Sequence, residues 1–510
     1  MFNAFALFRS LVIYGVCLPL AIILGYLVAN PEDMTNDTIV LVVLGVLMIP
    51  IFLKWHHPFL ILVWNMNALL FFLPGHPTFW LPAALTSFTI SLLNYIVNRK
   101  QGFLPAPTIT LPLLLLVGVV WLTARLTGGI GLRSAGGESF GGRRYITLFA
   151  AAIGFYAVIA RPIPLDKAAT YLKMYFLGAM PAIIGSLAGF LPSAFYIILM
   201  VFPSDSIQLL SVTQDFGNPN SSILRLGGLS VAGPAVFVTM IAIYGIRGIF
   251  EPTKFWRIII FSLSLGLSFF GGFRSSLIFA MFVFGAQFYY EGLMRSRLLP
   301  IIVVGVFVVS AFTLPFANKL PLSVQRTISF LPVDIDPNTR LDAQGSIEWR
   351  VGMWERVIQE VPKYLLVGKG YAIDPAAMEM SVRMNRGQDP YEGSLLAGDY
   401  HNGPLSVIVP FGIWGAITFL WFLWACFKVF YQHYKFGPPE IKHLNTLLLS
   451  YFVAKVIFFF TIFGSLYSDM PTFTGLIGLS IAMNGGVLVR AEKPAETPEF
   501  NRLKLITIMR

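Results

Sequence analysis

Charged residues and cysteines are both scarce in this chain. Only 12% of its 510 residues are Asp, Glu, Lys or Arg, whereas 56% are hydrophobic. This composition provides too little charge to cover a water-exposed surface, so it excludes an ordinary soluble protein and indicates a polytopic membrane protein. The two cysteines, Cys17 and Cys426, lie far apart in separate apolar runs. Their positions match neither a disulfide framework nor a cysteine metal site.

Acidic residues are the rarer of the two charged classes, with 25 Asp and Glu against 36 Lys and Arg. The resulting net charge of +11 favours contact with anionic membrane lipids, and it requires no nucleic-acid partner. Aromatic residues make up 15% of the chain. That fraction is typical of lipid-facing packing and of the aromatic belts at membrane interfaces.

Apolar runs long enough to cross a bilayer recur along the whole sequence. A helical crossing needs about 17 to 25 mostly apolar residues, and we therefore expect an all-α polytopic fold with about 12–14 transmembrane helices. The first run follows Arg9 and is longer than a signal-peptide core, so we expect it to be retained. The run at 174–202 contains Pro181 and Pro192, which predicts a kink or a re-entrant piece. The expected spans are 11–29, 38–53, 59–74, 79–97, 108–126, 146–160, 174–202, 231–249, 258–272, 275–290, 300–316, 404–427, 445–467 and 471–488.

Lys and Arg fall in alternate short connections between these spans, which predicts that those connections and both termini are cytoplasmic. The connection at 127–145 breaks the rule, because it is expected outside yet contains Arg133, Arg143 and Arg144. Either it binds an anion outside the membrane or the span count near it is wrong by one. The expected parts are N-terminal helices (1–230), a second helical group (231–316), a large periplasmic loop (317–403), C-terminal helices (404–488) and a cytoplasmic tail (489–510).

The large loop is patterned and is expected to be partly helical. After a candidate N-cap at Ser346, apolar residues recur at helical spacing up to Pro362, and these are Ile347, Val351, Trp354 and Ile358. The pattern predicts an amphipathic helix that stops at Pro362. On a helical wheel Arg350 lies at the margin of the apolar stripe, so we expect it to be partly desolvated. Arg356 lies on the opposite face and is expected to be exposed to water.

The loop ends in "GDYHNGPLSVIVPFGIWG" (398–415). Here His401 and Asn402 are followed by nine residues, Gly412, two residues and Gly415. This arrangement resembles the His-Asn and Gly-x-x-Gly signature of the O-antigen ligase family. Upstream, "WRVGMWERVIQEVPKYLLVGKGY" (349–371) is similar to that family's arginine-containing helix and glycine turn. "FFGGFRSSLIFA" (269–280) resembles its arginine at the outer start of an earlier span.

The resemblance implies an integral-membrane glycosyltransferase of the GT-C type in the bacterial inner membrane, with its active site facing the periplasm. Such an enzyme moves a glycan from an undecaprenyl diphosphate carrier to an acceptor hydroxyl, which belongs to lipid A-core in the ligases. Lipid-linked polysaccharide polymerases, whose acceptor is another glycan, and protein O-oligosaccharyltransferases share the pattern and remain alternatives. The resemblance assigns Arg274 and Arg350 to the diphosphate, and His401 to the family's essential histidine.

The chemistry of this reaction agrees with these residue types. A guanidinium group offers bidentate donors and stays charged, which suits a diphosphate leaving group. Histidine has an unperturbed pKa near neutral pH, so His401 is expected to take the proton of a sugar hydroxyl, with Asn402 orienting the ring or a hydroxyl. The scheme needs no metal and no other cofactor. Further candidates for substrate binding are Tyr400, Arg326 and Arg340, although we expect Arg326, Arg340, Arg383 and Arg386 to be solvated by default.

Each candidate also has a purely structural interpretation. His401 can cap a helix, Arg274 can reach from a helix end to lipid headgroups, and Arg350 can pair with Glu348 or Glu355. The pair Asp334 and Asp336 has the D-x-D spacing that holds a divalent metal in many nucleotide-sugar transferases. The Pro337-Asn338 dipeptide that follows instead favours a turn in which these carboxylates cap the backbone.

A transporter for a lipid-linked glycan is the competing functional class. Its sequence is expected to show repeated halves or charged residues in the middle of its spans. We find no convincing two-fold repeat, and the ionisable residues fall mainly at span ends. These observations favour the transferase.

Overall fold

In the computed structural model of the chain, the described residues are 52–71, 73, 75–99, 102–130, 141–203, 223, 225–376, 379 and 391–487, with isolated positions between 15 and 50. The chain divides into two compact units, 1–59 and 60–510. In the first unit, 52–59 are helical. Several expectations fall outside the described residues, namely the span at 11–29, most of that at 38–53, the tail, Arg133, Arg383 and Arg386.

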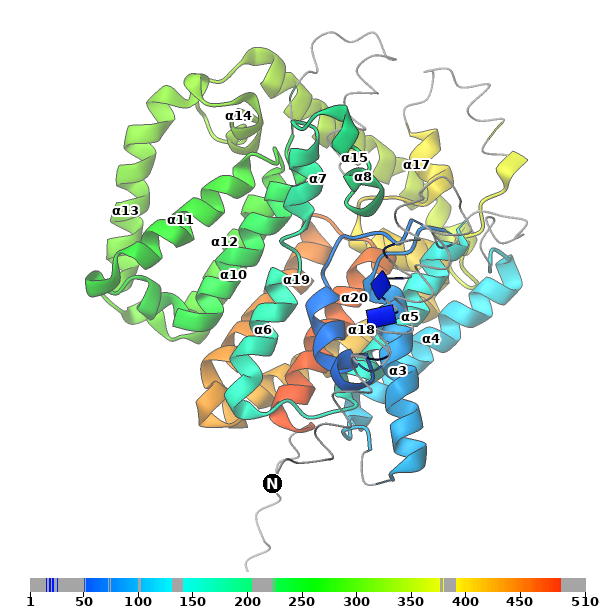
Figure 1. The fold of residues 1–510 in the computed structure, drawn as a ribbon. Coiled ribbons are helices and arrows are strands. Elements are labelled where there is room, and N and C mark those ends of the chain that lie inside the picture. Colours follow the sequence, from blue (N-terminus) through cyan, green and yellow to red (C-terminus); the bar gives the residue numbers. More distant parts are fainter. Residues whose placement is uncertain are drawn as a thin grey trace, which may run out of the picture. The chain divides into compact units, whose positions relative to one another are not determined.

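Helices form nearly all of the described part of the second unit (Figure 1), and no named strand occurs there. The helices are α3 (Trp80–Val97), α4 (Pro107–Thr127), α5 (Gly142–Ile159), α6 (Ala168–Leu177), α7 (Ala182–Ala188), α8 (Ile198–Val201), α10 (Gly227–Ile249), α11 (Trp256–Phe269), α12 (Arg274–Tyr290), α13 (Leu298–Thr313), α14 (Leu322–Ile328), α15 (Pro337–Tyr364), α17 (Glu392–Ala397), α18 (Gly403–Phe436), α19 (Lys442–Thr461) and α20 (Leu466–Asn484). The expected all-α fold is confirmed for this part of the chain.

Seven helical segments among the described residues are long and apolar enough to cross a membrane. The helix α13 shows why the bilayer is their solvent. None of its residues is buried inside the protein, and Phe307 and Phe312 are 73% and 74% exposed. An apolar helix with this much exposed apolar surface is stable in lipid but not in water. The protein is therefore membrane-embedded.

Most of the expected spans in the described region coincide with helices, but one does not. The span expected at 59–74 is wrong, because helix ends at Val63 and the chain then runs irregularly to α3. Asn65 explains part of this end, since its side-chain amide donates to the Tyr175 carbonyl at 2.8 Å. The break expected within 174–202 is confirmed. Pro181 precedes α7 and Pro192 precedes a short 3-10 turn, so the run becomes several short pieces.

The amphipathic helix of the loop is longer than expected. It begins at Pro337, where the Asp336 carboxylate accepts from the Thr339 N–H at 2.7 Å, and it ends at Tyr364. A cap of this kind with proline at the first helical position is a strong start signal. The expected N-cap at Ser346 and the expected stop at Pro362 are therefore wrong, because both residues lie inside α15.

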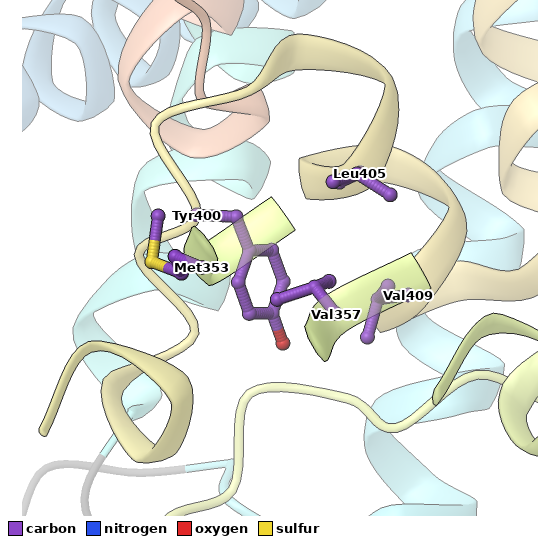
Figure 2. Packing of buried hydrophobic residues seen from close by; sticks show 5 residues of the cluster. All are labelled: Met353, Val357, Tyr400, Leu405 and Val409. Carbon is purple, nitrogen blue, oxygen red and sulfur yellow. The ribbon is translucent and has the colours of Figure 1, made fainter. Parts of the chain in front are cut away.

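The buried face of α15 also differs from the expected stripe. Ile347, Val351 and Ile358 are 49%, 43% and 57% exposed. The buried residues are instead Met353 and Val357, which pack against Tyr400, Leu405 and Val409 (Figure 2). Apolar residues lie on two faces of this helix, and periodicity alone does not say which of them meets the protein. The contact fixes α15 against the first turns of α18.

A break in α18 strengthens this contact. Gly412 has φ 62° and ψ −163°, and Pro410 lies two residues before it. The interrupted helix leaves backbone groups unbonded, and the turn after α15 satisfies them. The Ile413 N–H donates to the Leu365 carbonyl at 2.7 Å, and the Gly370 N–H donates to the Pro410 carbonyl at 2.9 Å. The glycine turn at 365–370 and the Gly-x-x-Gly motif at 412–415 are therefore hydrogen-bonded to each other, and we call this pair of segments the joint.

Candidate functional site

Three helices of the second unit begin near one another, namely α5, α18 and α20. Arg144, in the first turn of α5, donates to the Ala397 carbonyl just before α18, and its guanidinium carbon lies 4.6 Å from the Tyr467 ring of α20. Arg274 at the start of α12 donates to the α15 backbone. The beginning of a helix carries a partial positive charge. This region of the protein is thus suited to a negatively charged ligand.

His401 lies in the turn immediately before α18, between two aromatic rings. The centroid of its ring is 5.3 Å from that of Phe463 and 5.5 Å from that of Trp349, both edge-to-face. Its Nδ1 lies 3.1 Å from the Asp399 carbonyl oxygen and 3.6 Å from the Asp399 carboxylate. When Nδ1 carries the proton and donates to Asp399, Nε2 is left as an acceptor, which is the arrangement of a general base.

The backbone of His401 is in the left-handed region, with φ 51°. For a residue with a side chain this conformation costs roughly 1–2 kcal/mol relative to ordinary geometry. Strain of this kind gathers at functional sites, where the surrounding structure holds it in place. The neighbours supply that hold, since the Asn402 side-chain oxygen accepts from the Leu405 N–H at 3.0 Å. The Trp354 ring N–H donates to the Tyr400 carbonyl at 2.9 Å.

These bonds describe the two neighbours of His401 more closely than the sequence did. Asn402 is the N-cap of α18, and Tyr400 is 2% exposed, with burial raising the pKa of its phenol. Both therefore position the His401 turn. Direct substrate contact by either residue stays a prediction.

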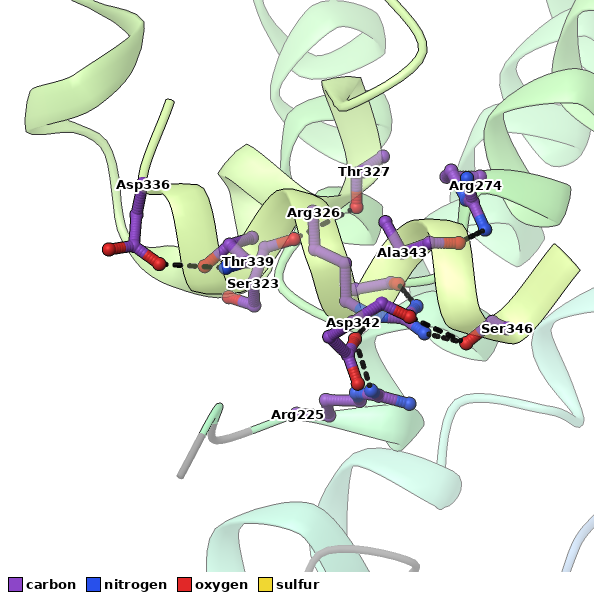
Figure 3. A network of polar contacts seen from close by, with 11 residues as sticks. Arg225, Arg274, Ser323, Arg326, Thr327, Asp336, Thr339, Asp342, Ala343 and Ser346 are labelled. Atoms are coloured by element: carbon purple, nitrogen blue, oxygen red, sulfur yellow. Dashed lines mark hydrogen bonds and ion pairs between the residues drawn. The ribbon is translucent and has the colours of Figure 1, made fainter. Parts of the chain in front are cut away.

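Arg326 is the centre of a buried polar network (Figure 3). Its guanidinium donates to the Asp342 carboxylate, to the Gly272 carbonyl at 2.6 Å and to the Ser346 hydroxyl at 2.9 Å. Arg225 bonds to the same Asp342 carboxylate at 3.2 Å. The expectation that Arg326 is solvated is wrong, because its residue is only 6% exposed. The short helix α14 places it between the start of α12 and the middle of α15.

Arg274 is the first residue of α12 and precedes the span expected at 275–290. It donates to the Ala343 carbonyl of α15 at 2.7 Å, so its side chain is directed to the loop helix (Figure 3). A guanidinium has five N–H donors, and this bond uses one of them. Burial and then the charges of Arg326 and Arg350 lower the pKa of Arg274. The three guanidinium groups are therefore close enough to repel one another.

Arg350 has no protein acceptor for its guanidinium among the described residues. It is half-buried on α15, and its guanidinium carbon lies 6.0 Å from the Phe463 ring. Burial and then the charge of Arg326 lower its pKa. The expected partial desolvation is confirmed, whereas pairing with Glu348 or Glu355 does not occur. Arg356 is exposed, as expected, and lies over Tyr391.

A cavity of about 480 Å³ adjoins these residues. Ser275 and Ser276, directly after Arg274, line it together with Phe463. The rest of the wall is mostly apolar, and its polar members are Asn65, Ser230, Tyr451 and Lys455. The Lys455 ammonium group pairs with the Asp469 carboxylate at 2.7 Å. Sequence reasoning missed Lys455. The available signal was a single lysine in the apolar run 447–463.

The two acids of the D-x-D pair have structural partners. Asp336 caps α15, as the turn interpretation predicts, and the Asp334 carboxylate accepts from Asn318 at 3.4 Å. Arg340 is also engaged locally, since it donates to the Val333 carbonyl. Within the described ranges, no group of three His, Cys, Asp or Glu side chains is arranged to hold a metal.

The structure thus brings His401, Arg350 and Arg274 to one region, through the shared neighbours Phe463 and α15. No family model and no curated protein matches the chain.

Proposed function

We propose that this protein is a GT-C type glycosyltransferase of the bacterial inner membrane that resembles the O-antigen ligases. It transfers a glycan from an undecaprenyl diphosphate carrier to an acceptor hydroxyl at the periplasmic face, with lipid A-core as the leading acceptor. One observation carries this proposal. Arg350 and His401 lie against the same Phe463 ring, 6.0 Å and 5.3 Å from its centroid. A charge for the leaving group and a base for the nucleophile therefore lie against one side chain, Phe463, which lines the cavity of about 480 Å³.

The arginines act on the leaving diphosphate. Arg350 has no protein acceptor in the described part of the chain, and Arg274 has donors beyond its one bond to Ala343. As the bond between the anomeric carbon and the diphosphate oxygen breaks, negative charge grows on that oxygen. Guanidinium groups held in place before the reaction stabilise this charge without further reorganisation. Arg326 bonds to Asp342 of α15 and to Gly272 just before α12, so it links the two helices that contain Arg350 and Arg274.

His401 acts on the incoming hydroxyl. With Nδ1 directed to Asp399, Nε2 accepts the proton of the acceptor hydroxyl while its oxygen attacks the anomeric carbon. The proton then leaves the histidine to solvent or to the released diphosphate. The strained turn and the two aromatic neighbours keep the ring oriented between turnovers.

The mostly apolar cavity beside Arg274 suits the lipid part of the donor. Ser275, Ser276 and Lys455 offer polar groups at its wall, and the remaining wall offers apolar contact to the first isoprene units. A carrier bound in this way presents its diphosphate at the beginning of α12. The arrangement explains why a charged site lies beside an apolar pocket.

Lipopolysaccharide from a strain lacking the gene tests the proposal. Unsubstituted core together with accumulated lipid-linked polymer is the expected result for a ligase, whereas core capped by a single repeat indicates a polymerase. Complementation with His401→Ala is expected to fail and with Arg356→Gln to succeed, at equal membrane abundance. Full complementation by His401→Ala would remove the transferase proposal and favour a transporter.

A further inference from the structure

A second and larger cavity, of about 690 Å³, lies where α5 and α20 begin. Its wall is rich in neutral polar side chains, which are Asn65, Asn67, Thr78, Thr147, Ser468 and Thr472. Two arginines, Arg143 and Arg144, complete the polar part of the wall, and none of the described lining residues is acidic. Hydroxyl and amide groups of this kind suit the hydroxyls of a sugar, and the arginines add a positive charge.

Arg143 is the available cation of this cavity. It is exposed, its carbonyl accepts from the Thr147 hydroxyl at 2.8 Å, and no acceptor for its guanidinium occurs among the described residues. The first turn of α5 contains no acid, and Gly141 at its start has no side chain to cap it. Both the guanidinium and the helix beginning therefore favour an anion. Arg143 belongs to the basic connection at 127–145 that breaks the positive-inside pattern.

Arg144 connects this cavity to the turn that holds His401. It donates to the Ala397 carbonyl, and its guanidinium carbon lies 4.6 Å from Tyr467 and 5.4 Å from Tyr371. Tyr467 lines the second cavity. Phe463, four residues earlier, lines the first cavity and contacts the His401 ring. Asn65 lines both cavities. The two cavities are therefore neighbours at Asn65.

We infer that the second cavity binds the acceptor glycan, and that this acceptor carries an anionic substituent, phosphate or carboxylate, which Arg143 binds. The role of this ligand as the acceptor rests on the proposed transferase function. The presence of a site for an anionic saccharide does not. With donor in the first cavity and acceptor in the second, the two substrates approach each other at Asn65, which lines both. His401 contacts the Phe463 wall of the first cavity.

Transfer kinetics test the acceptor role. Arg143→Gln is expected to raise the KM for a phosphorylated acceptor about tenfold or more and to leave the KM for the donor unchanged, and a dephosphorylated acceptor should not distinguish the variant from wild type. Arg125→Gln is the matched control, since Arg125 is exposed on α4 and does not line the cavity. An unchanged acceptor KM, or a raised donor KM, would overturn the inference while leaving the transferase intact.

Thiol labelling tests the anion site without any turnover. In a Cys17→Ala background, Thr147→Cys is expected to react faster with an anionic than with a cationic methanethiosulfonate, and Arg143→Gln should abolish the preference. Millimolar glucose 1-phosphate should slow the labelling and glucose should not. Equal rates for the two reagents, or protection by phosphatidylglycerol but not by glucose 1-phosphate, would overturn the saccharide site. If protection occurs but no transfer is ever detected, the proposed function fails and the site stands.

Discussion

Arg326 and Arg350 belong to the same cluster of positive charge, but they differ in burial and in the number of hydrogen-bond partners of their guanidinium groups. The guanidinium of Arg326 has a carboxylate, a carbonyl and a hydroxyl as partners, and the residue is almost completely buried. The guanidinium of Arg350 is half-buried beside an aromatic ring and has no acceptor among the described residues. Two residues of one type, on neighbouring helices, therefore differ in what remains for a ligand.

This difference separates structural from functional charge. A buried donor that has its partners stabilises the fold and offers nothing further. A partly desolvated cation without an acceptor costs folding free energy, and a bound anion recovers it. The sequence does not distinguish the two arginines, whereas the contacts place Arg326 in the scaffold and leave the Arg350 guanidinium without an acceptor among the described residues, as the proposed diphosphate contact requires.

The largest effect is expected at His401, where function and strain coincide. His401→Asn should lower the rate of transfer by about 10²–10⁴-fold, the usual contribution of a general base. Asparagine tolerates the left-handed backbone at this position, so the thermal unfolding temperature in detergent should stay unchanged. His401→Gly serves as a second variant that removes the strain as well as the ring. Transfer within tenfold of wild type by both variants would contradict the role of the base.

The next effect is on stability and belongs to the scaffold. Arg326→Met removes the bonds of a buried guanidinium and leaves Asp342, whose side chain is 30% exposed, with Arg225 as its remaining partner. Leaving groups of this kind with fewer partners costs about 1–3 kcal/mol. The unfolding temperature of the purified protein should therefore fall by several degrees. Replacing both residues, with Arg326→Met and Asp342→Leu together, should recover only part of the loss, because Arg225 then lacks its carboxylate partner. Equal unfolding temperatures for the single and double variants would show that the pair is not coupled.

Hydropathy was sufficient to predict the helical framework. Long apolar runs form helices in lipid because every backbone N–H and C=O must be hydrogen-bonded within its own segment. This requirement is local, and it predicts most of the helices of the fold. Prolines predicted the break within 174–202 for the same local reason. The partial burial of Arg350 was predicted correctly, but from an apolar stripe that is not the buried face of α15.

Long-range packing is what the sequence did not reveal. The buried face of α15 depends on α18, and the role of Arg326 depends on Asp342, Gly272 and Ser346. Phe463, which joins His401 to Arg350, is one aromatic residue among many in its run. The span expected at 59–74 was wrong because hydropathy does not show that the Asn65 side chain donates to the carbonyl of Tyr175, in another segment.

Arg350→Lys and Arg326→Lys sharpen the comparison directly. Lysine keeps the charge and loses the planar fork. At position 350 we expect transfer to fall by about 10²-fold, in the range for loss of one preorganised donor at a developing charge, with no change in unfolding temperature. At position 326 we expect the reverse, a lower unfolding temperature and a smaller loss of rate per folded molecule. Loss of stability without loss of rate in Arg350→Lys would place that arginine in the scaffold too.

The smallest loss of stability is expected at Gly412, where the backbone of α18 meets the turn that follows α15. Gly412 has φ 62°, and a Cβ there would lie 2.6 Å from the Leu365 carbonyl oxygen. Gly412→Ala should therefore cost about 1–3 kcal/mol, because its φ and ψ lie in a region that essentially only glycine adopts, measured as a lower unfolding temperature. Gly266→Ala is the control, because a Cβ there meets nothing within 4 Å and alanine favours the interior of a helix.

The same variant also tests how the joint transmits strain. The turn from Leu365 to Gly370 follows α15 directly, so displacing it moves Arg350 on α15 relative to His401 before α18. Transfer by Gly412→Ala should accordingly fall a few-fold more than its folded fraction does. A rate that follows the folded fraction alone would mean that the α15 to α18 contact around Met353 and Tyr400 sets the distance between arginine and histidine without help from the joint.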